Sequence, residues 1–185
     1  MNWLCIDFLN SDWRDWRGSG RRENRLAKQE WLEQLLREYA LHAPLPIDEA
    51  SAVALLRLRE YMRSLLERVV RGEALRQEEL EELNQTLAKA PFHVRVISAG
   101  KESGYEQELV SASSGWELVM ARIAASFATL LLPEHVQRIK ICDNEDCRWV
   151  FYDESRNRVR RWCDDKMCGN LMKVRRFRER QKEKK

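Results

Sequence analysis

The sequence predicts an α+β protein with a mainly helical N-terminal domain that contains a small β-hairpin. A smaller C-terminal module with four cysteines, a second β-hairpin and a basic helix is expected to follow it. Three observations support this prediction: apolar residues recur at helical spacing, the spacing changes to two near residue 95, and the cysteines form two equally spaced pairs. The expected domains are residues 1–137 and 138–185.

Length and composition are those of a globular protein. The chain has 185 residues, enough for one main core and a small appended module. Hydrophobic residues make up 44% of the chain and charged residues 34%. No uninterrupted apolar run reaches the ~20 residues that a membrane span needs, so a soluble protein is expected.

The first elements are expected to be short. Residues Leu4–Leu9 alternate loosely with polar ones and predict a short helix or strand, and Ser11–Arg25 predicts an irregular loop. A helix is then expected from Lys28 to the neighbourhood of Pro44 and Pro46. Its apolar positions are Trp31, Leu32, Leu35, Leu36 and Tyr39.

Two further helices follow. Asp48 is placed to cap the first of them, and Gly72 lies beyond its end. Its expected inner face consists of Val53, Leu56, Met62, Leu65, Leu66 and Val69. The next helix is expected over Gln77–Lys89, and Pro91 closes it.

The period changes after this helix. Residues His93–Ile97 and Tyr105–Val110, separated by glycines, predict a β-hairpin. A long, widely apolar helix is expected after Gly115 and is ended by Pro133, and its width predicts a central, buried position. The connector Glu134–Ile141 ends in a strand-like alternation.

The four cysteines Cys142, Cys147, Cys163 and Cys168 follow the spacing C-x4-C, x15, C-x4-C. This spacing suits one tetrahedral Zn²⁺ ion per chain, because each pair closes a short loop around the metal. Four thiolates fill all four zinc positions, so the ion would be structural rather than catalytic. Two disulfides, an iron–sulfur cluster and free thiols remain alternatives.

The start of the chain bears on the redox compartment. Met1–Leu9 is interrupted by Asn2 and Asp7 and is followed by charged residues, so it does not look like a secretory signal. A reducing cytoplasmic location is therefore expected, which disfavours disulfides. Cys5 stands apart from the other cysteines and is expected to be a buried apolar residue.

Two strand-like stretches, Arg148–Tyr152 and Arg158–Trp162, flank a turn composition at Asp153–Asn157. They are expected to pair as the hairpin of the zinc module. Three aromatic residues are expected to form its small core rather than to stack on bases: Trp149, Phe151 and Trp162.

Charge is unevenly distributed. Residues 138–185 carry 16 Lys and Arg against 9 Asp and Glu, whereas residues 1–137 carry 17 against 21. The tail Gly169–Lys185 predicts a basic helix that fits the major groove of double-stranded DNA, with Val174 and Phe177 turned inward. The expected nucleic-acid contacts are Lys173, Arg175, Arg176, Arg178 and Arg180.

The sequence motifs of this region are Trp162-Cys163, then Cys168-Gly169-Asn170, then Lys173, Arg176, Arg178 and Arg180. Because of these motifs, the segment Ile141–Arg180 resembles the CGNR zinc finger. The arginine of that motif is Leu171 here, so any DNA contact made by that arginine in relatives is absent from this chain. Lys173 and Arg176 replace its charge but not its geometry.

The opening Leu4-Cys5-Ile6-Asp7-Phe8-Leu9-Asn10, followed by a helix with Trp31-Leu32, resembles the ABATE domain. That domain precedes the CGNR finger in bacterial proteins classed as stress-induced transcription regulators. The resemblance implies a mixed helical and β N-terminal domain, a zinc-binding C-terminal module and a DNA-binding role in transcription.

An aromatic and basic cluster near the N-terminus is a candidate pocket for an anionic or aromatic ligand. Its candidate contacts are Asp7, Asn10, Trp13, Arg14, Trp16 and Arg17, and Arg21 and Arg22 complete the aromatic and basic cluster. The alternative is a loop that covers the core with solvated arginines, with Asp7 and Asn10 acting as helix or turn caps.

The leading hypothesis is a DNA-binding transcription regulator whose N-terminal domain senses a small-molecule effector or forms a homodimer. An RNA-binding or protein-interaction adaptor is the first alternative. A small enzyme in the N-terminal domain is the second, and it has little support because His42, His93 and His135 are scattered and no catalytic motif is recognisable.

Overall fold

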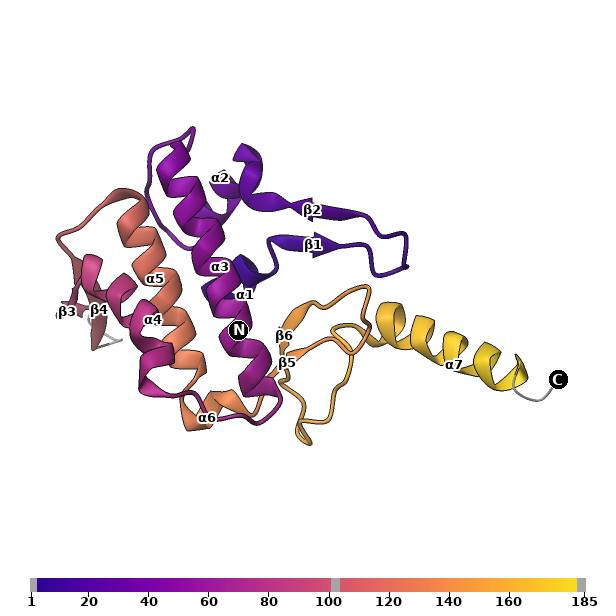
Figure 1. Ribbon diagram of the computed structural model, residues 1–185. Helices are drawn as coiled ribbons and strands as arrows, with labels where there is room; N and C mark the ends of the chain where they lie inside the picture. Colours follow the sequence, from indigo (N-terminus) through magenta and orange to yellow (C-terminus); the bar gives the residue numbers. More distant parts are fainter. Residues whose placement is uncertain (1–2, 101–103, 183–185) are drawn as a thin grey trace.

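Figure 1 shows a computed structural model of the chain, which describes residues 3–100 and 104–182. The last three residues of the predicted basic tail, 183–185, lie outside the described residues. The N-terminal elements are α1 Leu4–Leu9, β1 Asp12–Arg14, β2 Arg22–Asn24, a 3-10 turn Arg25–Ala27, α2 Gln29–Glu38, α3 Glu49–Val70 and α4 Gln77–Lys89. They are followed by β3 Phe92–Ser98, β4 Tyr105–Ser111, α5 Gly115–Leu130 and α6 Pro133–Val136. The chain ends with β5 Ile139–Ile141, β6 Val150–Tyr152, a π-helical turn Asp165–Gly169 and α7 Asn170–Lys182.

The predicted α+β class is confirmed. Helix α5 occupies the centre of the helical body and is buried along most of its length, as its wide apolar face predicts (Figure 1). Phe8 of α1 and Phe127 of α5 are fully buried in the same core. This core also includes Ile139 of β5 and Val150 of β6. The sheet of the C-terminal module therefore packs directly on the helical domain.

The second and third predicted helices are confirmed, with one corrected face. The carboxylate of Asp48 accepts a hydrogen bond from the Ser51 amide at 2.9 Å and so caps α3. The prediction that Val53 faces the core is wrong, because its side chain is 42% exposed. Leu55 and Leu58 are buried in its place, so the core face lies further round the helix than the sequence pattern indicated.

Helix α2 ends at Glu38, several residues before the prolines that were expected to terminate it. Ala40 adopts a left-handed conformation with φ of 50°. The Leu41 amide donates to the Leu36 carbonyl and the Ala40 amide donates to the Arg37 carbonyl, which is a Schellman-type ending. An alanine in place of the usual glycine hid this stop signal.

The segment 11–25 is a β-hairpin, so the prediction of an irregular loop is wrong. Strands β1 and β2 pair antiparallel from Asp12 opposite Asn24 to Arg14 opposite Arg22. The Asp12 carboxylate joins the two strands because it contacts the guanidinium groups of Arg14 and Arg22, each at 3.0 Å. Figure 1 shows this hairpin reaching out from the helical body above the C-terminal module.

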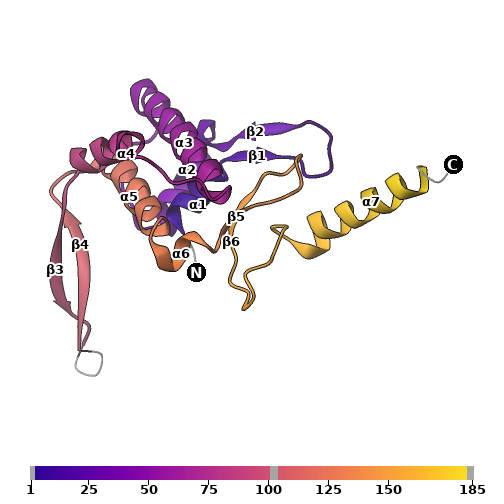
Figure 2. The same ribbon diagram turned by 60° about the horizontal axis from the view of Figure 1, so that its bottom comes forward.

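The hairpin β3–β4 is confirmed and has the register Phe92 opposite Ser111 to Ser98 opposite Tyr105. Figure 2 shows that it stands away from the helices on the side of the molecule opposite α7. The side chains of Val94 and Val96 are accordingly exposed.

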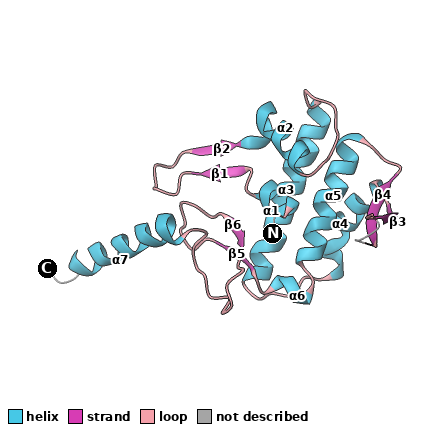
Figure 3. Cartoon of the chain, turned by 180° about the vertical axis from the view of Figure 1, so that it is seen from behind, coloured by secondary structure: helices cyan, strands magenta, loops and turns pink. Residues whose placement is uncertain are grey.

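The C-terminal module contains a β-hairpin, and the predicted strand within residues 148–152 is confirmed as β6, but its predicted partner is wrong. Strand β6 pairs antiparallel with β5, from Ile139 opposite Tyr152 to Ile141 opposite Val150. Residues 158–162 form no strand. The buried Asp153 carboxylate accepts hydrogen bonds from the amides of Ser155 and Arg160, at 3.0 and 2.9 Å, and holds this segment in a loop. Figure 3 shows that the loop, rather than a strand, leads to α7.

Candidate metal centre and basic helix

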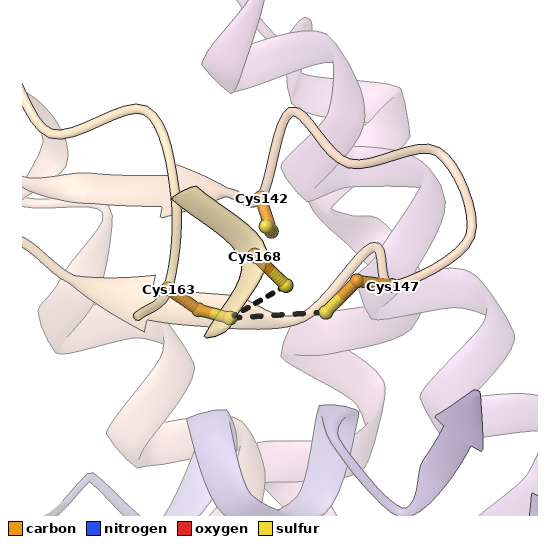
Figure 4. Close-up of side chains that lie close together, drawn as sticks. All are labelled: Cys142, Cys147, Cys163 and Cys168. Atoms are coloured by element: carbon orange, nitrogen blue, oxygen red, sulfur yellow. Dashed lines mark hydrogen bonds between the residues drawn. The ribbon is translucent and has the colours of Figure 1, made fainter. Parts of the chain in front are cut away.

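Four cysteine side chains point toward one another in the C-terminal module (Figure 4). The Sγ atoms of Cys142, Cys147, Cys163 and Cys168 all lie within 4.8 Å of one another. The Cys147–Cys163 and Cys163–Cys168 sulfur distances are 3.7 and 3.9 Å. Tetrahedral zinc with Zn–S bonds of about 2.3 Å requires sulfur separations of roughly 3.8 Å. The cluster therefore has the size and donor chemistry for one zinc ion.

The chain brings these sulfurs together with short turns. Cys142 directly follows β5, and the amides of Cys147 and Arg148 both donate to the Asn144 carbonyl, at 2.9 and 3.0 Å. Arg148 has a left-handed φ of 55°, which turns the chain back into β6. The π-helical turn that begins α7 contains Cys168, so the metal centre fixes the base of this helix.

All four thiols are free and crowded. Hydrogen bonds from Cys147 and Cys163 lower the pKa of Cys142 to about 2, because they stabilise its thiolate. The same hydrogen bond to Cys142 raises the pKa of Cys147 to about 12. The pKa of Cys163 is also raised by its hydrogen bond to Cys142. Without a cation the cluster thus favours one thiolate, and a bound dication removes the repulsion that keeps the other sulfurs protonated.

Asn144 connects the metal centre to the N-terminal hairpin. Its side chain is fully buried, and its Nδ2 group donates to the Trp16 carbonyl at 2.8 Å and contacts the Cys168 sulfur at 3.5 Å. Such contacts orient metal-binding sulfurs and stabilise their negative charge. Trp16 itself packs against the buried cysteines. No sequence pattern marks Asn144, since asparagine is common in polar loops.

Asn10 makes the second connection. Its buried side chain accepts a hydrogen bond from the Val150 amide at 2.8 Å and donates to the Val150 carbonyl at 2.9 Å. The side-chain carboxamide of Asn10 thus pairs with the backbone of β6 as a residue of a neighbouring strand would. The finger is docked on α1 through this residue.

The residues of the predicted ligand pocket are distributed over several places. Asp7 and Asn10 line a cavity of about 300 Å³, and the Asp7 carboxylate accepts a hydrogen bond from the Tyr39 hydroxyl. Burial raises the pKa of Asp7. Arg14 lines a different cavity. Trp13 lies beside Arg25, whose guanidinium is 5.9 Å from the centre of its ring. Trp16 packs on the metal centre, and the Arg17 guanidinium lies over the Trp16 ring.

Helix α7 bears the predicted basic residues and extends away from the body in both views (Figures 1 and 2). Arg175 points back: its guanidinium contacts the Asp146 carboxylate at 2.7 Å and the Arg17 carbonyl at 3.1 Å. Lys173, Arg176 and Arg180 lie together on another side of the helix and are exposed. Arg178 is also exposed.

The prediction that Val174 and Phe177 turn inward is wrong. Their side chains are 45% and 57% exposed. Helix α7 extends away from the body of the molecule (Figure 2). The expected aromatic core is confirmed, because Phe151 is buried among the cysteines and Trp149 and Trp162 pack against it.

Comparison with protein families agrees with this architecture. A family model described as "CGNR zinc finger" matches residues 138–181, and the ABATE family model, described as "Putative stress-induced transcription regulator", matches residues 2–133. No curated protein matches the chain. Among the described residues, no helix combines the length and apolarity needed to span a bilayer. The finger match and the sulfur cluster together indicate one structural zinc ion. Since the ABATE model covers well over half of the chain, the protein belongs to the ABATE family and carries a CGNR zinc finger.

Proposed function

We propose that the protein is a transcription regulator that binds double-stranded DNA through α7, with residues 1–137 as a sensory or oligomerisation domain and 138–185 as the DNA-binding domain. The observation that carries this proposal is the exposed, strongly basic helix anchored at its base by the metal centre. Within α7, six Lys or Arg residues stand against one acidic residue, Glu179.

The dimensions of such a helix suit DNA. An α-helix with side chains is about 10–12 Å wide, and the major groove of B-DNA is about 12 Å wide. The side of α7 that carries Lys173, Arg176 and Arg180 supplies contacts to phosphates or to guanine edges. Arg175 is engaged with Asp146 and the β1–β2 hairpin, so we assign it to positioning the helix rather than to the groove.

The alternative DNA contacts come from the apolar strip. Val174 and Phe177 are exposed on the same helix, and apolar side chains recognise the thymine methyl group in the major groove. The proposed helix thus offers both charge and apolar surface to a duplex. Leu171 in place of the family arginine adds to this apolar character.

A competition experiment on the zinc-loaded full chain tests the proposal. Duplexes are selected from a random genomic pool, and the enriched sequence is then competed with random DNA and structured RNA at physiological salt. The enriched duplex is expected to win. Equal binding to all three nucleic acids would contradict a sequence-reading regulator and support the RNA-binding or adaptor alternative.

Arg176→Ala with Arg180→Ala sharpens this test. The double variant should reduce the slope of log affinity against log salt by about two, because about one counterion is released per phosphate contact. A matched control removes two exposed arginines from the helical domain, Arg37→Ala with Arg57→Ala, and should leave the slope unchanged. If the α7 variant keeps the wild-type slope, this face does not bind DNA.

A further inference from the structure

A second basic site lies in the N-terminal domain, away from α7. A cavity of about 300 Å³ opens between the β1–β2 hairpin and α3. Four arginines line it: Arg14, Arg22, Arg59 and Arg63. Three carboxylates accompany them: Asp12, Glu60 and Glu67. Which of these charges are already neutralised decides what the cavity can bind.

Two of the carboxylates are fully engaged. Asp12 is shared by Arg14 and Arg22, each at 3.0 Å. Glu67 is shared by Arg63 at 3.0 Å and by Arg148 of the finger at 2.7 Å. Each carboxylate is thus shared by two guanidinium groups, and each trio keeps a net positive charge. The third carboxylate, Glu60, acts on Arg59 through space, so the lining carries four guanidinium groups against three carboxylates and keeps one excess positive charge.

Arg59 differs from the other arginines because its hydrogen-bond partners are neutral. Its side chain is largely buried, with 8% of the residue exposed. Its Nη1 group donates to the Ser11 hydroxyl and to the Asn24 side-chain oxygen, each at 2.8 Å. Both of these bonds use the same nitrogen, and among the described residues no hydrogen bond joins Arg59 to a carboxylate. Asp12 and Glu60 act on its charge only through space.

A buried guanidinium without a bonded counter-ion is costly. Burial lowers the pKa of Arg59, because removal from water disfavours its charged form. Ser11 and Asn24 fix the group in one orientation and leave part of its planar fork toward the cavity. A planar fork of this kind matches the two oxygens of a carboxylate or phosphate.

We propose that this cavity binds the oxyanion of a small effector, a phosphate or carboxylate group, with Arg59 as its principal contact and Arg22 at the rim. The inference rests on the proposed regulatory function, since it supplies the effector site of that regulator. The volume fits a small metabolite rather than a macromolecular segment. Leu9 supplies an apolar wall for the rest of the ligand.

A lining residue of the same cavity contacts the residue next to a metal ligand. Arg63 donates through Nη2 to the carbonyl of Arg148 at 2.9 Å, and Arg148 follows the ligand residue Cys147 in the chain. Glu67 holds the Arg148 side chain from the same helix. An anion that draws Arg63 away from Glu67 would loosen this contact, so occupancy of the cavity would alter how the finger is held on α3.

The test is a calorimetric titration of the zinc-loaded full chain, without DNA, using inorganic phosphate in one arm and succinate in the other. Wild-type protein is expected to bind one of these probes, and the arm that responds identifies the oxyanion. Arg59→Met should weaken that binding about tenfold or more, as expected for the loss of a charge-assisted fork. Arg57→Met removes an exposed arginine from the same helix and should bind as the wild type does.

Arg59→Met also loses its bonds to Ser11 and Asn24, so its thermal melting and zinc content are measured alongside. If it does not fold, the rim variant Arg22→Gln decides, and it should still weaken binding several-fold because it removes one donor. Absence of binding to both probes, or wild-type affinity in the cavity variants, would overturn the proposal. Loss of probe binding in Arg176→Ala with Arg180→Ala would overturn it as well, since the anion would then lie on α7.

This experiment separates the two proposals. Anion binding that depends on Arg59 stands even if no duplex is selected, and selective DNA binding stands even if no anion binds. A further measurement links them: the responsive probe should change hydrogen exchange at residues 147–150 in wild-type protein and leave it unchanged in Arg59→Met.

Discussion

The helical domain and the zinc finger are stabilised in different ways. The helical domain surrounds α5 with a continuous cluster of buried aliphatic and aromatic side chains. Among the described residues, the cluster around the metal centre has four buried members, of which three are cysteines and the fourth is Phe151. The burial of apolar surface stabilises the helical domain. The apolar core of the finger is too small to stabilise it alone, so the finger also requires a bound metal.

The comparison also shows where the two regions meet. Ile139 and Val150 belong to the large core, although they lie in the two strands of the finger. Asn10, Asn144 and Arg175 add polar connections across the same junction. The finger is therefore supported from both sides, by zinc at the sulfur cluster and by the helical domain at the sheet. The domain boundary between residues 137 and 138 stays a prediction.

Removing a zinc ligand should separate the two regions most strongly. Cys163→Ser is expected to abolish stoichiometric zinc and to unfold residues 142–149 and 153–182, because structural zinc contributes about 10–16 kcal/mol of binding free energy. Strand β6 should stay partly protected, since Val150 packs in the helical core. Metal analysis and hydrogen exchange measure the two effects. Helix α5 should keep its protection, since its packing involves no metal.

Cys5→Ala is the matched control for this substitution. Cys5 is fully buried in the helical core, where burial raises the pKa of its thiol to about 12. The control should keep one zinc per chain. If it loses zinc as Cys163→Ser does, the metal is not confined to the finger cluster.

A core truncation should act in the opposite direction. Phe127→Ala in α5 is expected to destabilise the helical domain by about 3–5 kcal/mol, because a fully buried aromatic side chain is replaced by a cavity. Denaturant unfolding followed by far-ultraviolet circular dichroism measures the change. Zinc content should stay at one per folded chain. A loss of zinc under native conditions would show that the finger depends more on the helical core than on its own zinc ligands.

Asn10→Ala should reduce the free energy that holds the finger on the helical domain by about 1–3 kcal/mol. This is the cost of leaving the buried Val150 amide and carbonyl without partners. Hydrogen exchange should accelerate in β6 more than in α5. Asn84→Ala, an exposed asparagine on α4, is the matched control and should have no such effect. Equal exchange in the two variants would mean that Asn10 does not hold the finger.

The smallest effect is expected at the base of α7. Arg175→Ala removes a partly exposed ion pair with Asp146 and should reduce the free energy of unfolding by at most about 1 kcal/mol. Exchange in the first turns of α7 should increase slightly while zinc content stays unchanged. Arg178→Ala, an exposed arginine on the same helix, should leave this exchange as it is. A similar increase in both variants would argue against an anchoring role for Arg175.

The sequence predicted what depends on periodicity and spacing. Helices α3, α4 and α5 repeat apolar residues over several turns. Strands β3 and β4 show a two-residue period and are separated by glycines. The cysteine spacing predicted the cluster because metal ligands must come from short closed loops. Each of these signals is local.

The features that sequence could not predict depend on distant partners. Strands β1 and β2 are three residues long and contain one apolar residue, Trp13, so no alternation marks them, and ion pairs to Asp12 join them instead. Strand β6 pairs with β5 because Asp153 holds the following segment in a loop. Asn10 and Asn144 are single polar residues whose roles appear only when the finger docks on the helical domain.

Hydrogen exchange measured along the whole chain, before and after removal of zinc by a chelator, tests the difference between the two regions most directly. The zinc-loaded protein should contain one ion per chain, and its removal should expose the amides of residues 142–149 and 153–182 while α5 stays protected. Protein that holds no zinc, or a finger that keeps its protection after the metal has gone, would contradict this account.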